Sequence, residues 1–154
     1  MKLATLCYIE KDNSYLMLHR VKIKNDMHKN LWVGLGGKFE AGESPEDCVI
    51  REVYEESGLE IRNPKLRGIM TFPKDFNNDD WYVFLYTANE FSGQIKSCSE
   101  GELVWVDKSK LNDLPMHEAD RHFLKWIQEN KGIFSVKFSY DNGFLNDYRV
   151  LFYE

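Results

Sequence analysis

Three glutamates between residues 52 and 56 carry the side chains with the most evident capacity for chemistry. Glu52, Glu55 and Glu56 stand three and four positions apart, so on a helix they would be neighbours, and like charges there repel by about 0.2–0.5 kcal/mol per pair. A hard divalent cation reverses that repulsion, because Mg²⁺ prefers carboxylate and water oxygens and is commonly shared with substrate phosphates. The spacing is compatible with a metal site for phosphate chemistry or with a solvated glutamate-rich helix face.

The segment around these glutamates has strong helix boundaries. Ser44 can act as the N-cap, Pro45 fits the first helical position, and Asp47 stands where a carboxylate reaches back to close a capping box. Gly58 is placed to end the helix. At about 100° per residue, the glutamates share one arc and apolar side chains share the other. The apolar arc that should pack against the protein comprises Val49, Ile50, Val53 and Tyr54.

The segment from residue 37 to residue 59 resembles the Nudix box, Gly-x5-Glu-x7-Arg-Glu-U-x-Glu-Glu-x-Gly-U, in which U is a bulky aliphatic residue. The resemblance implies a hydrolase of nucleoside diphosphates linked to another moiety, and an α/β/α sandwich with a mixed central β-sheet. A pattern of this length is highly specific. Every fixed position is matched, by Gly37, Glu43, Arg51, Glu52, Val53, Glu55, Glu56, Gly58 and Leu59.

The resemblance assigns roles to residues of the box. It implies that Glu52, Glu55 and Glu56 bind the metal, that the carbonyl of Gly37 is a further ligand, and that Arg51 orients a catalytic glutamate through a bidentate pair. A planar guanidinium supplies that geometry and a lysine does not. The implied cofactor is Mg²⁺, with Mn²⁺ as a possible substitute because both accept oxygen ligands.

Acids outside the helix are also candidates. Glu43 either hydrogen-bonds the helix start or reaches a metal-bound water. Enzymes of the MutT type often recruit one more glutamate from a loop before a later strand, and taking Trp105 as the anchor favours Glu100 as this catalytic and metal-binding residue, with Glu102 as the runner-up. Either loop acid could instead be merely solvated.

Several residues are candidates for binding substrate. Lys38 and Arg20 could contact phosphates, and Phe72 and Trp81 could form a stacking wall, although aromatic residues on strands more often belong to the core. Asp120 could hydrogen-bond a purine, against the alternative of a solvated acid in a helix's first turn. Arg51, Glu52, Glu55, Glu56 and Glu100 are the predicted catalytic residues.

The resemblance extends over nearly the full length to MutT homologues that hydrolyse oxidised purine triphosphates such as 8-oxo-dGTP. This chain has Val33 where that subgroup presents an asparagine to the base, and His117 and Ala119 where it has a tryptophan and an aspartate. We therefore expect a Mg²⁺-dependent nucleoside triphosphate pyrophosphohydrolase with a less polar base pocket. The alternatives are hydrolysis of another nucleoside or pterin triphosphate, or a nucleotide-binding sensor without activity.

Length and charge restrict the remaining possibilities. The 154 residues suit a single domain over 1–154, and a net charge of −5 without long basic runs argues against a long nucleic acid as substrate. No segment approaches the roughly 18 apolar residues needed to span a membrane. Cys7, Cys48 and Cys98 lie in no metal-binding spacing and are expected to be free thiols in the cytoplasm. Oligomeric state stays open.

Hydrophobic patterning predicts the elements that position these residues. A hairpin should join the strands at 3–9 and 15–19, the polar stretch 20–30 should form a loop, and an amphipathic helix should span 118–128. A C-terminal hairpin over 133–140 and 144–152 should turn at Asp141-Asn142-Gly143, because Asn-Gly tolerates positive φ angles. Further strands are expected at 31–39, 65–72, 81–88 and 103–106, with a polar turn at 74–80 and a loop after residue 88.

Overall fold

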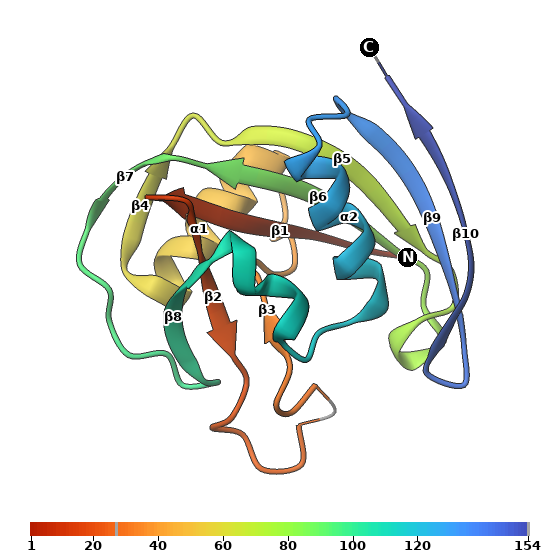
Figure 1. The fold of residues 1–154 in the computed structure, drawn as a ribbon, viewed down its shortest axis with the longest axis horizontal. Coiled ribbons are helices and arrows are strands. Elements are labelled where there is room, and N and C mark those ends of the chain that lie inside the picture. Colours follow the sequence, from red (N-terminus) through yellow and green to blue (C-terminus); the bar gives the residue numbers. More distant parts are fainter. Residues whose placement is uncertain (27, 154) are drawn as a thin grey trace.

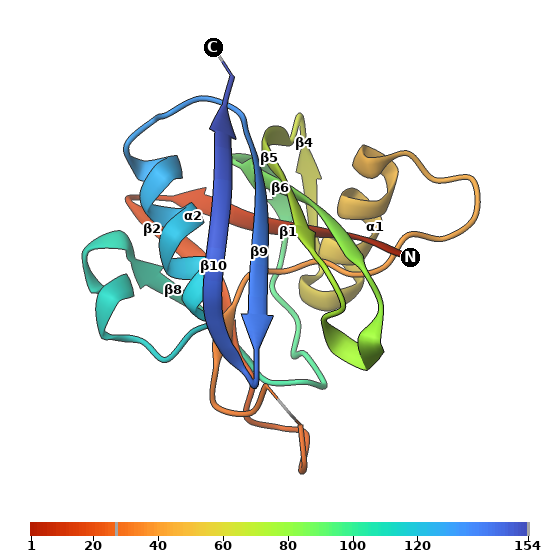
Figure 2. The same cartoon turned by 90° about the vertical axis from the view of Figure 1, so that its right-hand side faces the viewer.

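The computed structural model describes residues 1–26 and 28–153. A strongly twisted mixed sheet lies between two helices, with α1 (Pro45–Ser57) on one face and α2 (Glu118–Gln128) on the other (Figures 1 and 2). This arrangement is the α/β/α sandwich with a mixed central sheet that the sequence predicted. Among the described residues, no helix is long and apolar enough to cross a bilayer.

The main sheet has eight strands within the described part of the chain. Its order is β10-β9-β5-β6-β1-β2-β3, with β8 also paired to β2. The β1–β6 and β5–β9 pairs are parallel and the others are antiparallel. The strands are β1 (Lys2–Lys11), β2 (Ser14–His19), β3 (Trp32–Val33), β5 (Lys65–Phe72), β6 (Trp81–Ala88), β8 (Glu102–Asp107), β9 (Phe134–Asp141) and β10 (Phe144–Phe152).

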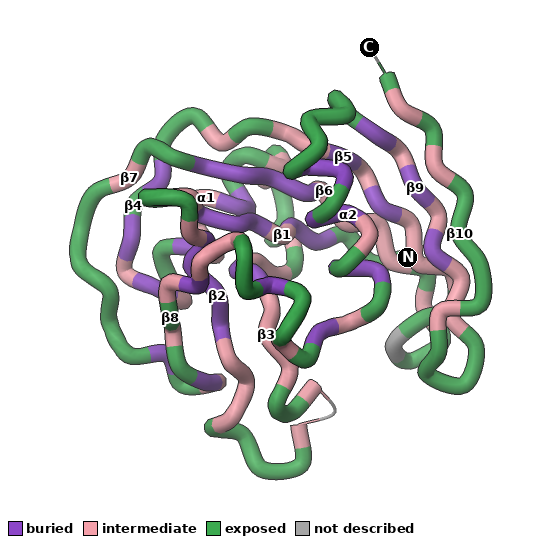
Figure 3. Tube along the Cα trace, in the orientation of Figure 1, coloured by how far each residue is buried: buried purple, intermediate pink, exposed green. Residues whose placement is uncertain are grey.

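Each face of the sheet carries its own hydrophobic core. The core under α2 includes Phe123 and Tyr8, and the core under α1 includes Val49, Val53 and Leu35. Buried positions run along the central strands, whereas much of the edge strand β10 is exposed (Figure 3). Helix α1, which carries the glutamates, is therefore anchored on one face of the sheet by its apolar side chains.

Helix α1 begins and ends where the sequence predicted. The Ser44 side chain accepts a hydrogen bond from the Asp47 amide and the Asp47 carboxylate accepts one from the Ser44 amide, which completes the capping box. Gly58 adopts φ 81°, a left-handed conformation that glycine adopts readily. Tyr54 is the exception on the predicted apolar arc. Its side chain is 54% exposed, and Cys48 is buried with Val49 and Val53.

Both predicted hairpins are present. Lys11 pairs with Ser14 across a turn in which Asp12 and Asn13 have positive φ, and Asp141 pairs with Phe144 across Asn142-Gly143 in the same manner. The polar stretch at 74–80 contains the 3-10 turn η1 (Phe76–Asn78), and a longer 3-10 segment η2 (Lys108–Asp113) follows β8.

Two sequence predictions of secondary structure need correction, and one strand was missed. The segment 31–39 forms only the two-residue strand β3, and the rest touches β1 through isolated bridges at Leu35 and Lys38, because its glycines interrupt regular pairing. The loop expected after residue 88 contains β7 (Glu90–Gly93). It pairs with β4 (Leu59–Arg62), a strand the sequence analysis did not predict, to form a small second sheet.

Candidate active site

A cavity of about 930 Å³ gathers most of the predicted site residues. Its walls come from β1, the glycine loop at 34–38, α1, β5, β6, the loop at 96–100 and α2, so segments distant in sequence meet there. Arg51 and Glu102 are not in its walls. The predicted residues that line it are Arg20, Gly37, Lys38, Glu52, Glu55, Glu56, Phe72, Trp81, Glu100 and Asp120.

Glu56 lies at the enclosed end of the acidic wall. Its Oε1 accepts a hydrogen bond of 2.7 Å from the Gly36 amide. Burial raises the pKa of the Glu56 carboxyl to about 8, the Gly36 hydrogen bond opposes this rise, and the charges of Glu100 and Glu52 add to it. The negative charges of Glu100 and Glu52 thus add to the cost of ionising Glu56, and a cation placed among the three carboxylates would relieve it.

Arg51 binds the carboxylates that border this wall. Its Nε and Nη2 donate to the two Glu43 oxygens at 2.6 and 2.9 Å, whereas Nη1 donates to Glu52 at 2.9 Å and to Glu55 at 3.2 Å. The bidentate partner is therefore Glu43, and the contact with Glu52 is a single hydrogen bond. The Arg51 hydrogen bonds lower the pKa of Glu43 to about 2, and the Glu40 amide assists. Glu43 thus binds Arg51 and the Glu40 amide, whereas the hydrogen bonds at the helix start are made by Ser44 and Asp47.

Gly37 permits the close approach of the loop to α1. A Cβ on Gly37 would lie 2.5 Å from the Glu52 carboxylate, so a side chain here would displace that group. The Gly37 carbonyl, the predicted metal ligand, accepts a hydrogen bond of 2.9 Å from the Thr5 amide. The Thr5 hydroxyl and the Cys48 thiol also donate to this oxygen, each at 3.5 Å, so a metal ion would compete with these two longer hydrogen bonds for its second lone pair.

The loop after β7 contributes Glu100 to the cavity. Its Oε2 accepts a hydrogen bond of 3.0 Å from Arg20 Nη1, while Arg20 Nε donates to Asp26 at 2.7 Å. Glu102 instead lies on β8, exposed and in register with His19. The structure thus places Glu100 at the site and Glu102 outside it. Arg20 lines the cavity and donates hydrogen bonds to two carboxylates, those of Glu100 and Asp26.

The donor set at the acidic wall fits a hard divalent cation. In the described residues, no three His, Cys, Asp or Glu side chains converge as a ready-made ligand cluster. Mg²⁺ keeps several waters and uses one or two carboxylates together with substrate phosphates, so such a cluster is not required. Burial is the main cause of the raised pKa of Glu56, and the nearby charges of Glu100 and Glu52 add to it, so a cation would stabilise the ionised carboxylate there. The predicted oxygen ligands are Gly37, Glu52, Glu55, Glu56 and Glu100.

The opposite end of the cavity is more apolar and aromatic. Phe72 stacks on Phe138 with ring centroids 5.5 Å apart, and Lys38 Nζ lies 5.7 Å from the centre of the Trp81 ring. Val33 also lines the cavity, as expected for a base pocket with fewer polar groups. Phe72 and Trp81 are therefore at the cavity wall, where a planar base could lie against them.

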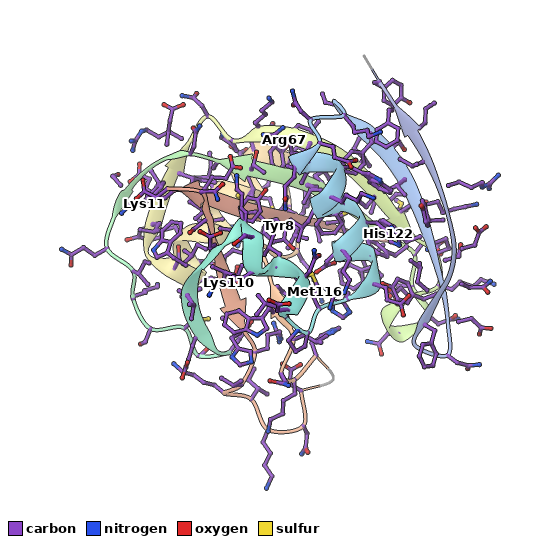
Figure 4. The ribbon with its side chains drawn as sticks, in the orientation of Figure 1. Tyr8, Lys11, Arg67, Lys110, Met116 and His122 are labelled. Atoms are coloured by element: carbon purple, nitrogen blue, oxygen red, sulfur yellow. The ribbon has the colours of Figure 1, made fainter. Side chains whose placement is uncertain are left out.

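Asp120 is the buried acid at this end. Only 7% of the residue is exposed, and burial raises the pKa of its carboxyl to about 7, against the opposing effects of Arg121 and the neighbouring Tyr8 hydroxyl. Tyr8 itself lies at the centre of the molecule (Figure 4), and its side chain is fully buried. Asp120 is thus buried, so the alternative that it is a solvated acid in the first turn of the helix is wrong.

The structure adds cavity residues that the sequence analysis did not single out as site residues. His28 lines the cavity beside His117, with ring centroids 5.0 Å apart, and burial lowers the pKa of both, to about 4 for His117. Lys96 lines the wall near Glu55, its Nζ 5.6 Å from the Tyr54 ring centre. No sequence motif indicates Lys96. Its position depends on the loop returning to the end of α1, where the Lys96 amide donates a hydrogen bond to the Ser57 carbonyl.

Comparison with known proteins identifies the family. The Nudix domain family matches residues 2–127, most of the chain and all of the acidic wall. The chain belongs to the Nudix family. It is 36% identical over 151 residues to YvcI of Bacillus subtilis (strain 168), an uncharacterized Nudix hydrolase, and the match covers 95% of this chain and 92% of that protein. This chain is therefore a Nudix hydrolase, and it acts on a nucleotide substrate.

Solved and curated relatives extend the comparison. The crystal structure of a MutT protein from Bacillus halodurans matches with a TM-score of 0.86 and 30% identity, covering 97% of both chains. An ADP-ribose pyrophosphatase of Methanocaldococcus jannaschii is 29% identical over 124 residues, 77% of this chain and 70% of that protein. The fold and the MutT-like placement within the Nudix family are thus established, whereas these relatives carry different substrate names.

Proposed function

We propose that this Nudix hydrolase is a divalent-cation-dependent pyrophosphohydrolase of nucleoside triphosphates, and that it prefers oxidised purine nucleotides such as 8-oxo-dGTP. The observation that carries the proposal is the shared cavity with Glu52, Glu56 and Glu100 at one end and Asp120 among aromatic side chains at the other. A polyphosphate at the acidic end and a purine at the aromatic end would occupy it together.

The chain's own residues explain how the acidic end would act. A bound Mg²⁺, or Mn²⁺ in its place, would neutralise the polyphosphate and make water at the site more acidic. Arg51 fixes Glu52 through one hydrogen bond and the Gly36 amide fixes Glu56, so both carboxylates are positioned before substrate arrives. A glutamate of this wall removes the proton from the attacking water, and the products are a monophosphate and pyrophosphate.

The base end supports a modified purine. Asp120 is buried with a pKa near neutrality, so its carboxyl can accept a hydrogen bond when ionised or donate one when protonated. Val33 and Ala119 add no polar group, which leaves Asp120 as the main hydrogen-bonding group of the predicted base contacts. A site with one such group discriminates between bases chiefly by whether the base edge that faces the group carries a hydrogen-bond donor or an acceptor.

A second candidate is an ADP-ribose-type substrate, which the name of the M. jannaschii relative favours. A pterin triphosphate is a further alternative, because Asp120 could equally bind a pterin edge. A nucleotide sensor without activity remains the other class, although the acidic wall of this chain is intact.

A nucleotide panel tests the proposal. Pyrophosphate release with Mg²⁺ should give a higher kcat/KM for 8-oxo-dGTP than for dGTP. ADP-ribose yields AMP and ribose 5-phosphate rather than pyrophosphate, so its hydrolysis is followed by AMP release, and it should be a poor substrate. Equal kcat/KM for 8-oxo-dGTP and dGTP would refute the oxidised-purine preference. Hydrolysis of ADP-ribose alone would favour the second candidate, and binding without turnover would favour the sensor.

We expect the enzyme to act in the cytoplasm. Cys7, Cys48 and Cys98 are all free and buried, as suits a protein that folds under reducing conditions.

A further inference from the structure

A second cavity of about 420 Å³ adjoins the aromatic end of the active-site cavity. His28, Phe72, His117 and Asp120 line both cavities, so these four side chains form the boundary between them. This second space, here called the side cavity, therefore lies next to the active-site cavity, with these side chains between the two. Its volume lies in the range of about 300–1,000 Å³ found for small-molecule pockets.

The side cavity suits an apolar, planar group. Its remaining walls include Leu31, Ala119 and Tyr140, and the Tyr140 hydroxyl is already engaged by the Ala119 amide at 2.9 Å. Both histidines at the boundary have lowered pKa values because of burial, so at neutral pH they present uncharged rings. Among the described residues of this wall, Asp75 adds the one carboxylate besides Asp120. Ala119 gives room that a larger residue would fill.

We propose that the side cavity is a subsite for an apolar ring carried on the exocyclic nitrogen of a purine nucleoside triphosphate. This inference rests on the proposed function, because it requires the purine to face Asp120. An N6-substituted adenine keeps one N–H that the Asp120 carboxylate can accept. Its substituent, on the same nitrogen, would then extend past these boundary side chains into the side cavity, towards Leu31 and Ala119.

The test compares ATP with N6-benzyl-ATP in the presence of Mg²⁺. The parent enzyme should hydrolyse N6-benzyl-ATP with a kcat/KM at least equal to that for ATP. Ala119→Leu, and independently Leu31→Phe, reduce the space of the side cavity from two different segments. Each should lower the ratio of kcat/KM for N6-benzyl-ATP over ATP about 10-fold or more, the scale on which a pocket discriminates by size.

Glu118→Leu is the matched control, because it adds the same side chain to the same turn of α2 at an exposed position outside both cavities. It should leave the ratio unchanged. The subsite is refuted if the parent strongly disfavours N6-benzyl-ATP while hydrolysing ATP, or if the folded cavity variants keep the parent's ratio. Neither result would affect the proposed pyrophosphohydrolase activity.

If no nucleotide is hydrolysed, the affinities of the protein for N6-benzyl-AMP and AMP, measured by calorimetry, test the subsite independently of the proposed hydrolysis. Tighter binding of the benzyl compound, lost in Ala119→Leu or Leu31→Phe, would support the subsite even though the proposed hydrolysis had failed. Binding of AMP alone, or of neither compound, would refute the subsite.

Discussion

Replacing Asp120 by asparagine should stabilise the protein above neutral pH while weakening its selection of the base. Asp120 is buried, and its pKa in the folded protein is about 7 against an ordinary value of 3.8. The folded state therefore binds a proton more tightly than the unfolded chain does. By linkage, ionisation of this carboxyl costs folding free energy, and the cost grows as the pH rises.

The pKa difference sets the magnitude and the pH window. A rise from 3.8 to about 7 corresponds to about 4 kcal/mol when Asp120 is ionised in both states. The penalty is absent below pH 4, grows between pH 4 and 7, and is complete above pH 7. The asparagine side chain of the variant is always neutral and has nearly the same shape as the carboxyl it replaces. Asp120→Asn should thus gain up to about 4 kcal/mol at pH 8, or up to roughly 10 °C in Tm.

Urea unfolding of the parent and of Asp120→Asn at intervals from pH 4 to 8.5 measures this directly. The stability difference should be near zero at pH 4 and should rise to a plateau above pH 7. Glu118→Gln is the control, because Glu118 lies on the same turn of the helix but is exposed, and its effect should vary little over this range. A difference for Asp120→Asn that is constant with pH, or that grows as the pH falls, would refute the reasoning.

Three further substitutions test the acidic wall. Glu56→Gln removes a charge at nearly constant volume and should lower kcat at least ~10²-fold in a Mg²⁺-dependent assay, with the fold retained by circular dichroism; near-normal turnover would contradict the assignment. The lysine of Arg51→Lys cannot keep both hydrogen bonds to Glu43 together with the one to Glu52. The kcat should therefore fall about 10-fold and the Tm should decrease. A fully active variant would mean that Arg51 is only a surface charge. Gly37→Ala would place a Cβ 2.5 Å from the Glu52 carboxylate, so kcat should fall about 10-fold. The free energy of unfolding should change by less than about 1 kcal/mol, because the end of the Glu52 side chain can move. An unchanged kcat would mean that the position of Glu52 is not critical.

Local signals in the sequence predicted the catalytic helix accurately. The Ser44 and Asp47 capping box and the left-handed Gly58 depend on residues within a few positions, so the sequence contains all the information needed. The two hairpins were predictable for the same reason, because Asn-Gly and Asp-Asn turns specify their own geometry. The fold class followed from the box as a whole, through family resemblance.

Contacts between distant segments could not be predicted in this way. Strands β4 and β7 are four residues each and pair with one another. The alternation of Leu59 to Arg62 is the shortest pattern that indicates a strand, and β7 has no such alternation. The preference of Arg51 for Glu43 depends on how the loop before α1 folds back. The sequence suggested Asp120 as a base contact but left the solvated first-turn acid open, because only the packing of α2 on the sheet buries it.

The most direct test of the proposed reaction is product analysis of 8-oxo-dGTP hydrolysis with Mg²⁺, in parallel for the parent and Glu56→Gln. The account predicts that the parent releases 8-oxo-dGMP and pyrophosphate in equal amounts, at a rate at least ~10²-fold above that of the variant. Release of 8-oxo-dGDP and inorganic phosphate, or equal rates for the two proteins, would contradict it.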